Sequence, residues 1–175
     1  MKKCIIFFLF IYSAFAVAIE RIELKDDYQT IYVDKINNWT MARNLFGIPF
    51  TFFSPKLHGQ RSNISFTDTG VKLGLDKTSI SDVKEYKRMK EKWSEQTDSV
   101  IITFLSFESY LNQFKHQIYK IGFIFQNEGK NYVETSYYIQ CRKQIIFSKS
   151  LRLEANKEHE VYFNQLIQSL NCSEN

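Results

Sequence analysis

The stretch that decides the fold is residues 118–153, IYKIGFIFQNEGKNYVETSYYIQCRKQIIFSKSLRL. Its apolar residues recur at every second position in three successive runs, which is the period of a β-strand with a buried face. The turn sequence NEGK at 127–130 separates the first two runs, and asparagine and glycine tolerate the positive φ that hairpins require. Arg142 and Lys143 separate the second run from the third. The pattern therefore predicts a meander of three antiparallel strands.

The apolar face of this meander is expected to lie at the centre of a sheet. Its residues, in chain order, are Tyr119, Ile121, Phe123, Phe125, Val133, Tyr137, Ile139, Cys141, Ile145, Phe147, Leu151 and Leu153. Lys149 interrupts the face in the third strand. We therefore expect a bulge, an edge position or a different register at this residue.

Two helices are expected to pack on the sheet. Residues 79–96 carry apolar side chains at close to helical spacing, and a serine can cap the start. The apolar positions are Ile80, Val83, Tyr86, Met89 and Trp93. Residues 157–170 carry a second apolar stripe, formed by Phe163, Leu166, Ile167 and Leu170. Lysines between residues 84 and 92 could dock an acidic partner, but interleaved glutamates favour an ordinary solvated helix face.

Further strands are predicted at 28–34, 49–55, 63–68 and 100–107. Pro49 and Pro55 confine the second of these to a sheet edge or to strand ends, because proline lacks an N–H to donate. Residues 107–114 fit a helical turn as well as a strand. The sequence thus predicts one α+β domain, an antiparallel sheet of about six strands with two main helices packed on it.

The start of the chain has the pattern of a signal peptide. Lys2 and Lys3 precede an apolar run at 4–18, which ends in the small residues of Ala16-Val17-Ala18. The alternative is a membrane anchor, but the run is shorter than the ~20 residues that a spanning helix needs. We expect cleavage after Ala18, a single domain over 19–175, and a protein that is exported and either periplasmic or secreted.

Net charge indicates little about partners. The chain has 23 basic and 19 acidic residues, a formal charge of +4. Loss of Lys2 and Lys3 with the signal peptide would lower the net charge from +4 to +2. This balance by itself implies neither nucleic acid nor an anionic surface, and no nucleic-acid partner is expected.

A disulfide between Cys141 and Cys172 is expected. Removal of the signal peptide takes away Cys4 and leaves these two thiols, and exported proteins favour disulfides. The third meander strand runs from the Cys141 end to Leu153, about 30 Å. A helix over 157–170 would return across the sheet by about 21 Å and bring Cys172 close to Cys141. Two free thiols are the alternative.

No catalytic or metal-binding motif is evident. Cys141 could be a nucleophile partnered by His116 or His159, but it lies on an inward face at a strand end. His58, His116 and His159 lack the spacing of metal ligands. We therefore expect no cofactor, no metal and no enzymatic activity.

One surface is a candidate for partner binding. Tyr132 and Tyr138 flank Glu134 and Ser136 on the sheet face that points away from the helix over 157–170. Exposed tyrosines of this kind can anchor a protein partner. The alternative is that another strand or a loop covers them.

The order of elements resembles a known family. A first strand leads to Trp39, then to strands at 49–55 and 63–68, the helix at 79–96, the meander and a closing helix that ends in LIQSL at 166–170. This is similar to the PsbP/Mog1/DcrB-type α/β sandwich, an antiparallel sheet with helices packed on it. The resemblance implies an extracytoplasmic or accessory binding protein rather than an enzyme, and it supplies no catalytic residues.

The leading hypothesis is a non-enzymatic exported protein that binds or assembles with a protein partner in the bacterial envelope. A hydrolase whose site is assembled from scattered side chains is the first alternative. A chaperone or immunity-type partner of a secreted protein is the second. No membrane span is expected after signal removal, and the oligomeric state stays open.

Overall fold

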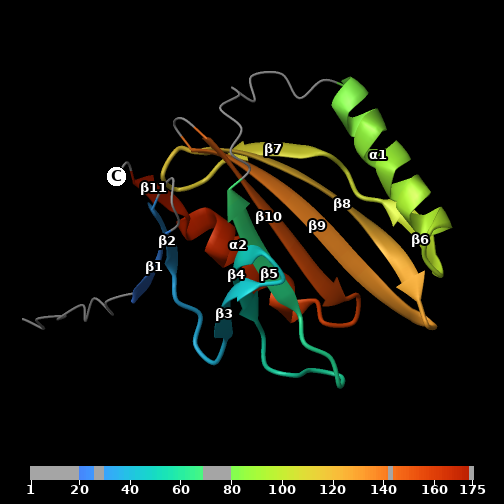
Figure 1. Ribbon diagram of the computed structural model, residues 1–175, viewed down its shortest axis with the longest axis horizontal. Helices are drawn as coiled ribbons and strands as arrows, with labels where there is room; N and C mark the ends of the chain where they lie inside the picture. The colour runs from blue at the N-terminus through green and yellow to red at the C-terminus, as the bar shows by residue number, and fades with distance from the viewer. Residues whose placement is uncertain (1–19, 26–29, 69–79, 142–143, 174–175) are drawn as a thin grey trace, which may run out of the picture.

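A computed structural model describes residues 20–25, 30–68, 80–141 and 144–173. These residues form an eight-stranded antiparallel sheet, a three-stranded antiparallel sheet and two α-helices (Figure 1). The predicted α+β class with two main helices is confirmed. The predicted strand number of about six is too low, because several short strands carry no clear two-residue period.

The large sheet has the order β3-β4-β5-β10-β9-β8-β6, and β7 also pairs with β8. Its strands are β3 (Thr40–Leu45), β4 (Ile48–Phe53), β5 (Asn63–Asp68), β6 (Ser99–Phe104), β7 (Glu108–Leu111), β8 (Gln117–Asn127), β9 (Lys130–Cys141) and β10 (Gln144–Leu153). The small sheet has the order β1-β2-β11. Its strands are β1 (Arg21–Lys25), β2 (Thr30–Asp34) and β11 (Asn171–Ser173).

The predicted meander is confirmed as β8, β9 and β10. Asn127 pairs with Lys130, and the two residues between them have positive φ, 48° at Glu128 and 71° at Gly129. This is the two-residue turn whose twist matches the twist of antiparallel strands. The meander is the centre of the large sheet, since β5 pairs with β10 and β6 and β7 pair with β8.

The prediction of one shared apolar face is wrong for the middle strand. Phe123 of β8 pairs with Glu134 of β9, and Leu151 of β10 pairs with the same residue. The residues predicted for this face on β8 and β10, such as Phe123 and Leu151, therefore lie on one face, and Tyr137 and Ile139 of β9 lie on the other. Both faces can be apolar because each is covered by a helix.

The bulge or edge position expected at Lys149 is not found. The β9–β10 register runs without interruption through this residue, which pairs with Ser136 on β9 and Ser65 on β5. Lys149 thus lies within a polar strip that crosses three central strands. Its Nζ atom is 3.6 Å from the carboxylate of Glu134 on the same face.

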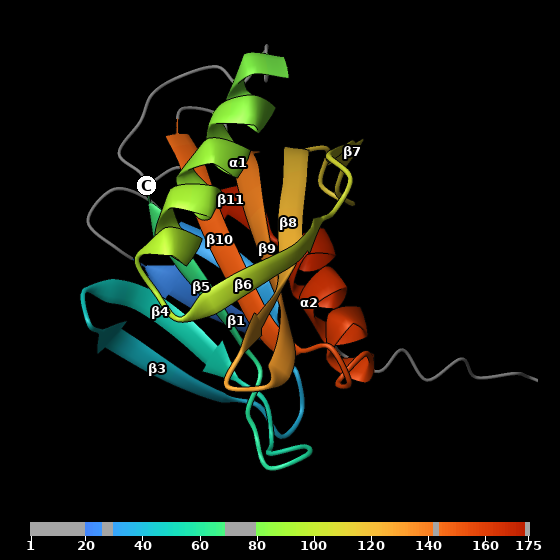
Figure 2. The same ribbon diagram turned by 90° about the vertical axis from the view of Figure 1, so that its right-hand side faces the viewer.

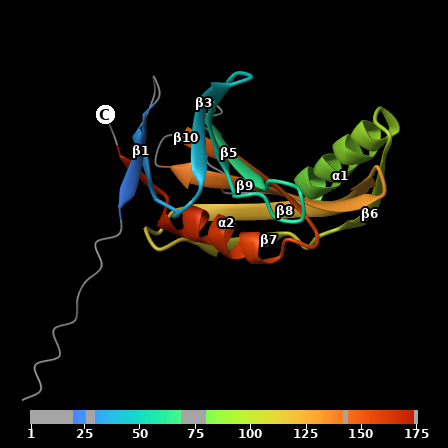
Figure 3. The same cartoon turned by 90° about the horizontal axis from the view of Figure 1, so that it is seen from below.

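Helices α1 (Ile80–Glu95) and α2 (Glu158–Ser169) lie on opposite sides of the large sheet and toward opposite ends of it (Figure 3). Below α1, Tyr86 packs with Ile121, Phe123 and Phe125 of β8. The larger core lies between the sheet, the small sheet and α2. Its members include Leu24, Ile31, Val33, Phe50, Phe52, Ile64, Phe66, Ile118, Tyr137, Ile139, Phe163, Leu166 and Ile167.

Two local expectations are decided by the strand pairing. Residues 107–114 contain the strand β7, so the helical alternative is wrong there. Strand β4 lies between β3 and β5, and Pro49 is tolerated near its first residue, as expected for a proline at a strand end. Strands β1 and β3 were not predicted.

Neither described helix is long and apolar enough to cross a membrane.

Candidate functional site

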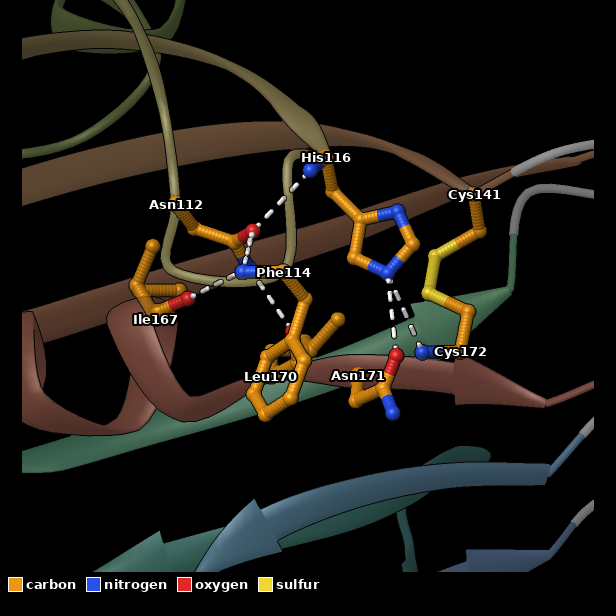
Figure 4. Close-up of a disulfide and its surroundings, with 8 residues drawn as sticks. All are labelled: Asn112, Phe114, His116, Cys141, Ile167, Leu170, Asn171 and Cys172. Atoms are coloured by element: carbon orange, nitrogen blue, oxygen red, sulfur yellow. Dashed lines mark hydrogen bonds between the residues drawn. A yellow bond between two sulfur atoms is a disulfide. The ribbon is translucent and has the colours of Figure 1, made fainter.

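Cys141 and Cys172 form a disulfide, with their Cα atoms 5.8 Å apart (Figure 4). Cys141 is the last residue of β9, and Cys172 lies in β11, which pairs with β2. The bond therefore connects the large sheet to the small sheet. This is the pair that the sequence predicted.

The loop between β7 and β8 holds the end of α2 beside this disulfide. The buried Asn112 side chain donates to the backbone carbonyl oxygens of Ile167, at 3.3 Å, and Leu170, at 2.7 Å. Its Oδ1 atom accepts from the backbone N–H groups of Phe114 and His116, both at 3.0 Å (Figure 4). One amide thus satisfies carbonyls that the last turn of a helix leaves unpaired.

His116 completes this cluster. Its Nε2 atom lies 3.3 Å from the backbone nitrogen of Cys172 and 3.3 Å from Oδ1 of Asn171. Cys141 is 2% exposed and its sulfur is bonded to another sulfur. The alternative that His116 or His159 activates Cys141 as a nucleophile is therefore wrong in this oxidised state. The cluster is a structural connection.

The structure brings together a serine and a histidine that the sequence did not connect. Oγ of Ser62 and Nδ1 of His159 are 2.7 Å apart, and the Trp39 ring packs against the imidazole in a T-shaped arrangement at a centroid distance of 5.8 Å. Such a pair could generate a nucleophile. However, Ser62 is fully buried and His159 is 5% exposed, so a substrate cannot reach the hydroxyl. The pair attaches the loop before β5 to the start of α2.

Burial lowers the pKa of His159 below its ordinary value of 6.5. The nearby Glu158 carboxylate opposes this shift, and the Arg152 guanidinium adds to it. The neutral imidazole is therefore the form that the folded protein stabilises. Among the described residues, no group of three or more histidine, cysteine, aspartate or glutamate side chains could hold a metal ion.

The candidate tyrosine surface lies on the side of the sheet that carries α1. Tyr132 stacks on Phe125 at 5.4 Å, and Tyr138 packs against Phe147 at 5.2 Å, so both rings are half-buried. Glu134, between them on β9, is buried at 7% exposure. The role of Tyr132, Glu134 and Tyr138 in partner binding stays a prediction.

Helix α1 is attached to this face by Lys90. The ammonium group bonds to the carboxylate of Glu134. It also lies over the rings of Phe123, Tyr86 and Trp93, at 5.0, 5.6 and 6.0 Å from their centroids. An ammonium over aromatic faces is stabilised by their negative quadrupoles. Lys90 is one of the lysines between residues 84 and 92 for which the sequence favoured a solvated helix face over a docking patch. Its side chain instead packs within the protein itself.

The β3–β4 hairpin ends in a side chain that is not packed against the described part of the chain. We define the β3–β4 tip as Leu45, Phe46, Gly47 and Ile48. Leu45 pairs with Ile48, and the turn residues between them have φ values of 51° and 79°. Phe46 is 96% exposed. Figure 2 shows the hairpin projecting from one side of the molecule.

A bulky residue with positive φ is uncommon, because its Cβ is crowded in this conformation. Nothing in the described fold compensates for placing an exposed phenylalanine there. The tip is therefore the strongest candidate contact site of the described residues. The strands predicted from the sequence did not include this hairpin, although Asn44 and Gly47 between alternating apolar residues are a usable hairpin pattern.

Solved structures resemble this chain over most of its length. Cyanobacterial PsbP (CyanoP) from Synechocystis sp. PCC 6803 superposes with a TM-score of 0.61 at 12% identity, covering 91% of this chain and 96% of that one. The chain has a PsbP/Mog1-like fold. This confirms the resemblance seen in the sequence.

A second solved structure with this fold is LpqN of Mycobacterium tuberculosis, described as involved in cell envelope biogenesis. It superposes with a TM-score of 0.53 at 12% identity, and the match covers 89% of this chain and 92% of LpqN. No protein-family model and no curated protein matches the sequence. At this identity the likeness concerns the fold, and it carries no catalytic or binding residue over to this chain.

Proposed function

We propose that this protein is an exported, non-enzymatic binding protein that attaches to another component of the bacterial envelope through the β3–β4 tip. The observation that carries the proposal is Phe46, 96% exposed on a turn where its backbone has positive φ. Exposed aromatic residues are over-represented at binding surfaces because they bury a large area on contact.

Two features support an extracytoplasmic location. The chain starts with a basic and apolar pattern typical of a signal peptide, and it contains the Cys141–Cys172 disulfide. Disulfides persist in oxidising compartments and are rare in the cytosol. LpqN, which shares the fold, is described as involved in cell envelope biogenesis.

The Ser62–His159 pair could serve the hydrolase alternative, but its burial argues against that use. A chaperone or immunity-type role is a special case of binding, in which the partner is a secreted protein. Identification of what contacts Phe46 separates this case from the leading one.

The test is site-specific photo-crosslinking in the native bacterium. A benzophenone side chain placed at Phe46 should give a crosslinked product. The same probe at Val161, which is 66% exposed on α2, is the matched control and should give none. Equal products at both positions, or no product at either, would contradict the role of the tip.

Export is tested separately by the mass of the protein recovered from the native cell. We expect a chain that begins at Ile19. A chain that retains residues 1–18 and fractionates with the cytosol would contradict export without bearing on the tip.

A further inference from the structure

The shape of the β3–β4 tip restricts what it can contact. It is a narrow convex protrusion whose described side chains are Leu45, Phe46 and Ile48, all apolar. Asn44, Phe46 and Gly47 all have positive φ, at 53°, 51° and 79°, so the turn is already in a defined conformation. A preformed tip loses little conformational entropy on binding. A convex apolar tip can enter a lipid surface without a complementary pocket.

The charge around the tip favours an anionic surface. No aspartate or glutamate occurs between Asp34 and Asp68, while Lys35, Arg43, Lys56 and Arg61 lie in this interval. The overall net charge does not reveal this distribution. Entry of the hairpin into a layer of lipid headgroups would therefore bury no carboxylate of its own.

Only one of these cations is near the tip. Arg43 precedes Phe46 by three residues on β3, about 10 Å at the rise of a strand. An apolar side chain buried ~5–10 Å into the boundary between headgroups and acyl chains would place such a cation at the lipid phosphates. The exposed Arg43 guanidinium lies 5.3 Å from the Phe50 ring centroid and 3.5 Å from the backbone oxygen of Glu23.

The other cations in this interval contribute less than Arg43 to attraction between the tip and an anionic surface. Arg61 lies at the base of the hairpin, where its Nη1 atom is 3.4 Å from Oγ1 of Thr40. This is farther from the tip than the screening length of ~8–10 Å at physiological ionic strength. Lys35 pairs with Glu20 at 2.8 Å. Glu23 on β1, whose backbone oxygen lies 3.5 Å from Arg43, has an exposed side chain.

We propose that the β3–β4 tip is a membrane-contact site that inserts Phe46 into the headgroup boundary of an anionic phospholipid bilayer, with Arg43 on a lipid phosphate. This inference rests on the proposed function and names the partner class of the same tip. A protein with an apolar pocket is the competing occupant.

The test is sedimentation of the exported protein with vesicles of phosphatidylcholine alone and of phosphatidylcholine mixed with phosphatidylglycerol. Phe46→Ser should lower the partition coefficient about tenfold or more, as expected for loss of one buried phenylalanine. Phe46→Trp should retain binding. Arg43→Gln should lower it about fivefold on the anionic vesicles only, and added salt should have the same effect.

Val161→Ser is the matched control, because it removes an apolar side chain that is exposed on α2, away from the β3–β4 tip, and it should leave binding unchanged. Circular dichroism should be the same for all variants, since neither Phe46 nor Val161 is buried. Absence of binding to both vesicles, or equal binding by Phe46→Ser, overturns the inference. If the protein binds neither kind of vesicle while a probe at Phe46 still crosslinks a protein, the proposed function stands and the lipid partner is wrong.

Discussion

At the scale of single residues, Glu134 is a carboxylate that the fold buries. Its side chain is 9% exposed and lies between two cations, Lys90 of α1 and Lys149 of β10. A carboxylate in such a place is tolerated only because both partners remain charged nearby. Glu134 therefore attaches α1 to the sheet, together with the apolar contacts of Tyr86 and Trp93.

Replacement of Glu134 by glutamine should destabilise the protein by about 2–3 kcal/mol, because Lys90 would remain largely buried among aromatic rings without its counter-ion. Urea unfolding monitored by circular dichroism measures the change. Glu91→Gln is the control, since Glu91 is exposed on the same helix and should change stability by less than about 0.5 kcal/mol. A Glu134→Gln variant as stable as wild type would show that the pair contributes nothing.

His159 predicts a dependence of stability on pH. Because its pKa is below the ordinary value of 6.5 in the folded protein, the unfolded chain takes up the proton first as pH falls. The contribution of neutral His159 is complete above pH 6.5 and declines below it, until the pH has passed the folded pKa. Urea unfolding at about pH 7.5 and about pH 5.5 should show this loss. It should be smaller in His159→Gln, and an equal loss in both proteins would assign it to other groups.

At the scale of elements, the packing of β8 against β9 depends on a missing side chain. A Cβ atom added at Gly122 would lie 2.5 Å from the backbone oxygen of Glu134 and 3.1 Å from Cδ1 of Leu105. The backbone oxygen cannot move without disturbing the central strand pair. Leu105 packs over this position because glycine leaves it free.

Gly122→Ala should therefore cost about 2–3 kcal/mol through overpacking. Gly129→Ala is the matched control, because nothing lies within 4 Å of its added Cβ and only its φ of 71° is unfavourable. It should cost about 1 kcal/mol. The two free energies of unfolding measure the difference, and equal values would show that the strands separate readily.

The disulfide acts between elements that are far apart in the sequence. It closes a loop with a sequence separation of 31. Replacing both Cys141 and Cys172 by serine should lower stability by about 3–4 kcal/mol on the chain-entropy account. The loss should appear in urea unfolding without reductant and should vanish when wild type is compared in its reduced form. Alkylation of two thiols in the exported, unreduced protein would contradict the disulfide.

At the scale of the whole molecule, one large sheet separates two cores of different size. Trp93 packs in the core beneath α1, where its ring lies 5.7 Å from Phe123. Trp39 packs in the core beneath α2, where its ring lies 5.6 Å from Phe163. Each tryptophan thus reports on one side of the sheet.

The two sides should unfold together, because the central strands β8, β9 and β10 supply side chains to both cores. Fluorescence of Trp39→Phe reports the α1 side, and fluorescence of Trp93→Phe reports the α2 side. For each variant, the urea transition followed by fluorescence should coincide with the transition followed by circular dichroism. A fluorescence transition that precedes the loss of circular dichroism would show that one core opens alone.

Much of this architecture was predictable from local patterns. The period of two in 118–153 predicted the meander, and the apolar stripes predicted both helices, because these signals depend only on residues close in sequence. The direction of each face was not predictable. Tyr137 and Ile139 give the same alternation whether they face α1 or α2, and the choice depends on which helix covers which side.

The candidate contact site was missed for a related reason. Phe46 has an apolar side chain, and sequence reasoning assigns apolar residues to a core. Its exposure follows from the pairing of Leu45 with Ile48, which places it at the end of a projecting hairpin. Conversely, Glu134 is charged and was expected at a surface, yet α1 covers it.

By itself, the sequence determined the fold class, the central meander, the two helices and the pairing of Cys141 with Cys172. These follow from periodicity and from the small number of cysteines. Only the tertiary structure decided the apolar sets on the two sheet faces, the burial of Ser62 with His159, the location of Glu134 beneath α1 and the exposure of Phe46. Those depend on contacts between residues distant in sequence, and alternation along one strand carries no information about what lies across from it.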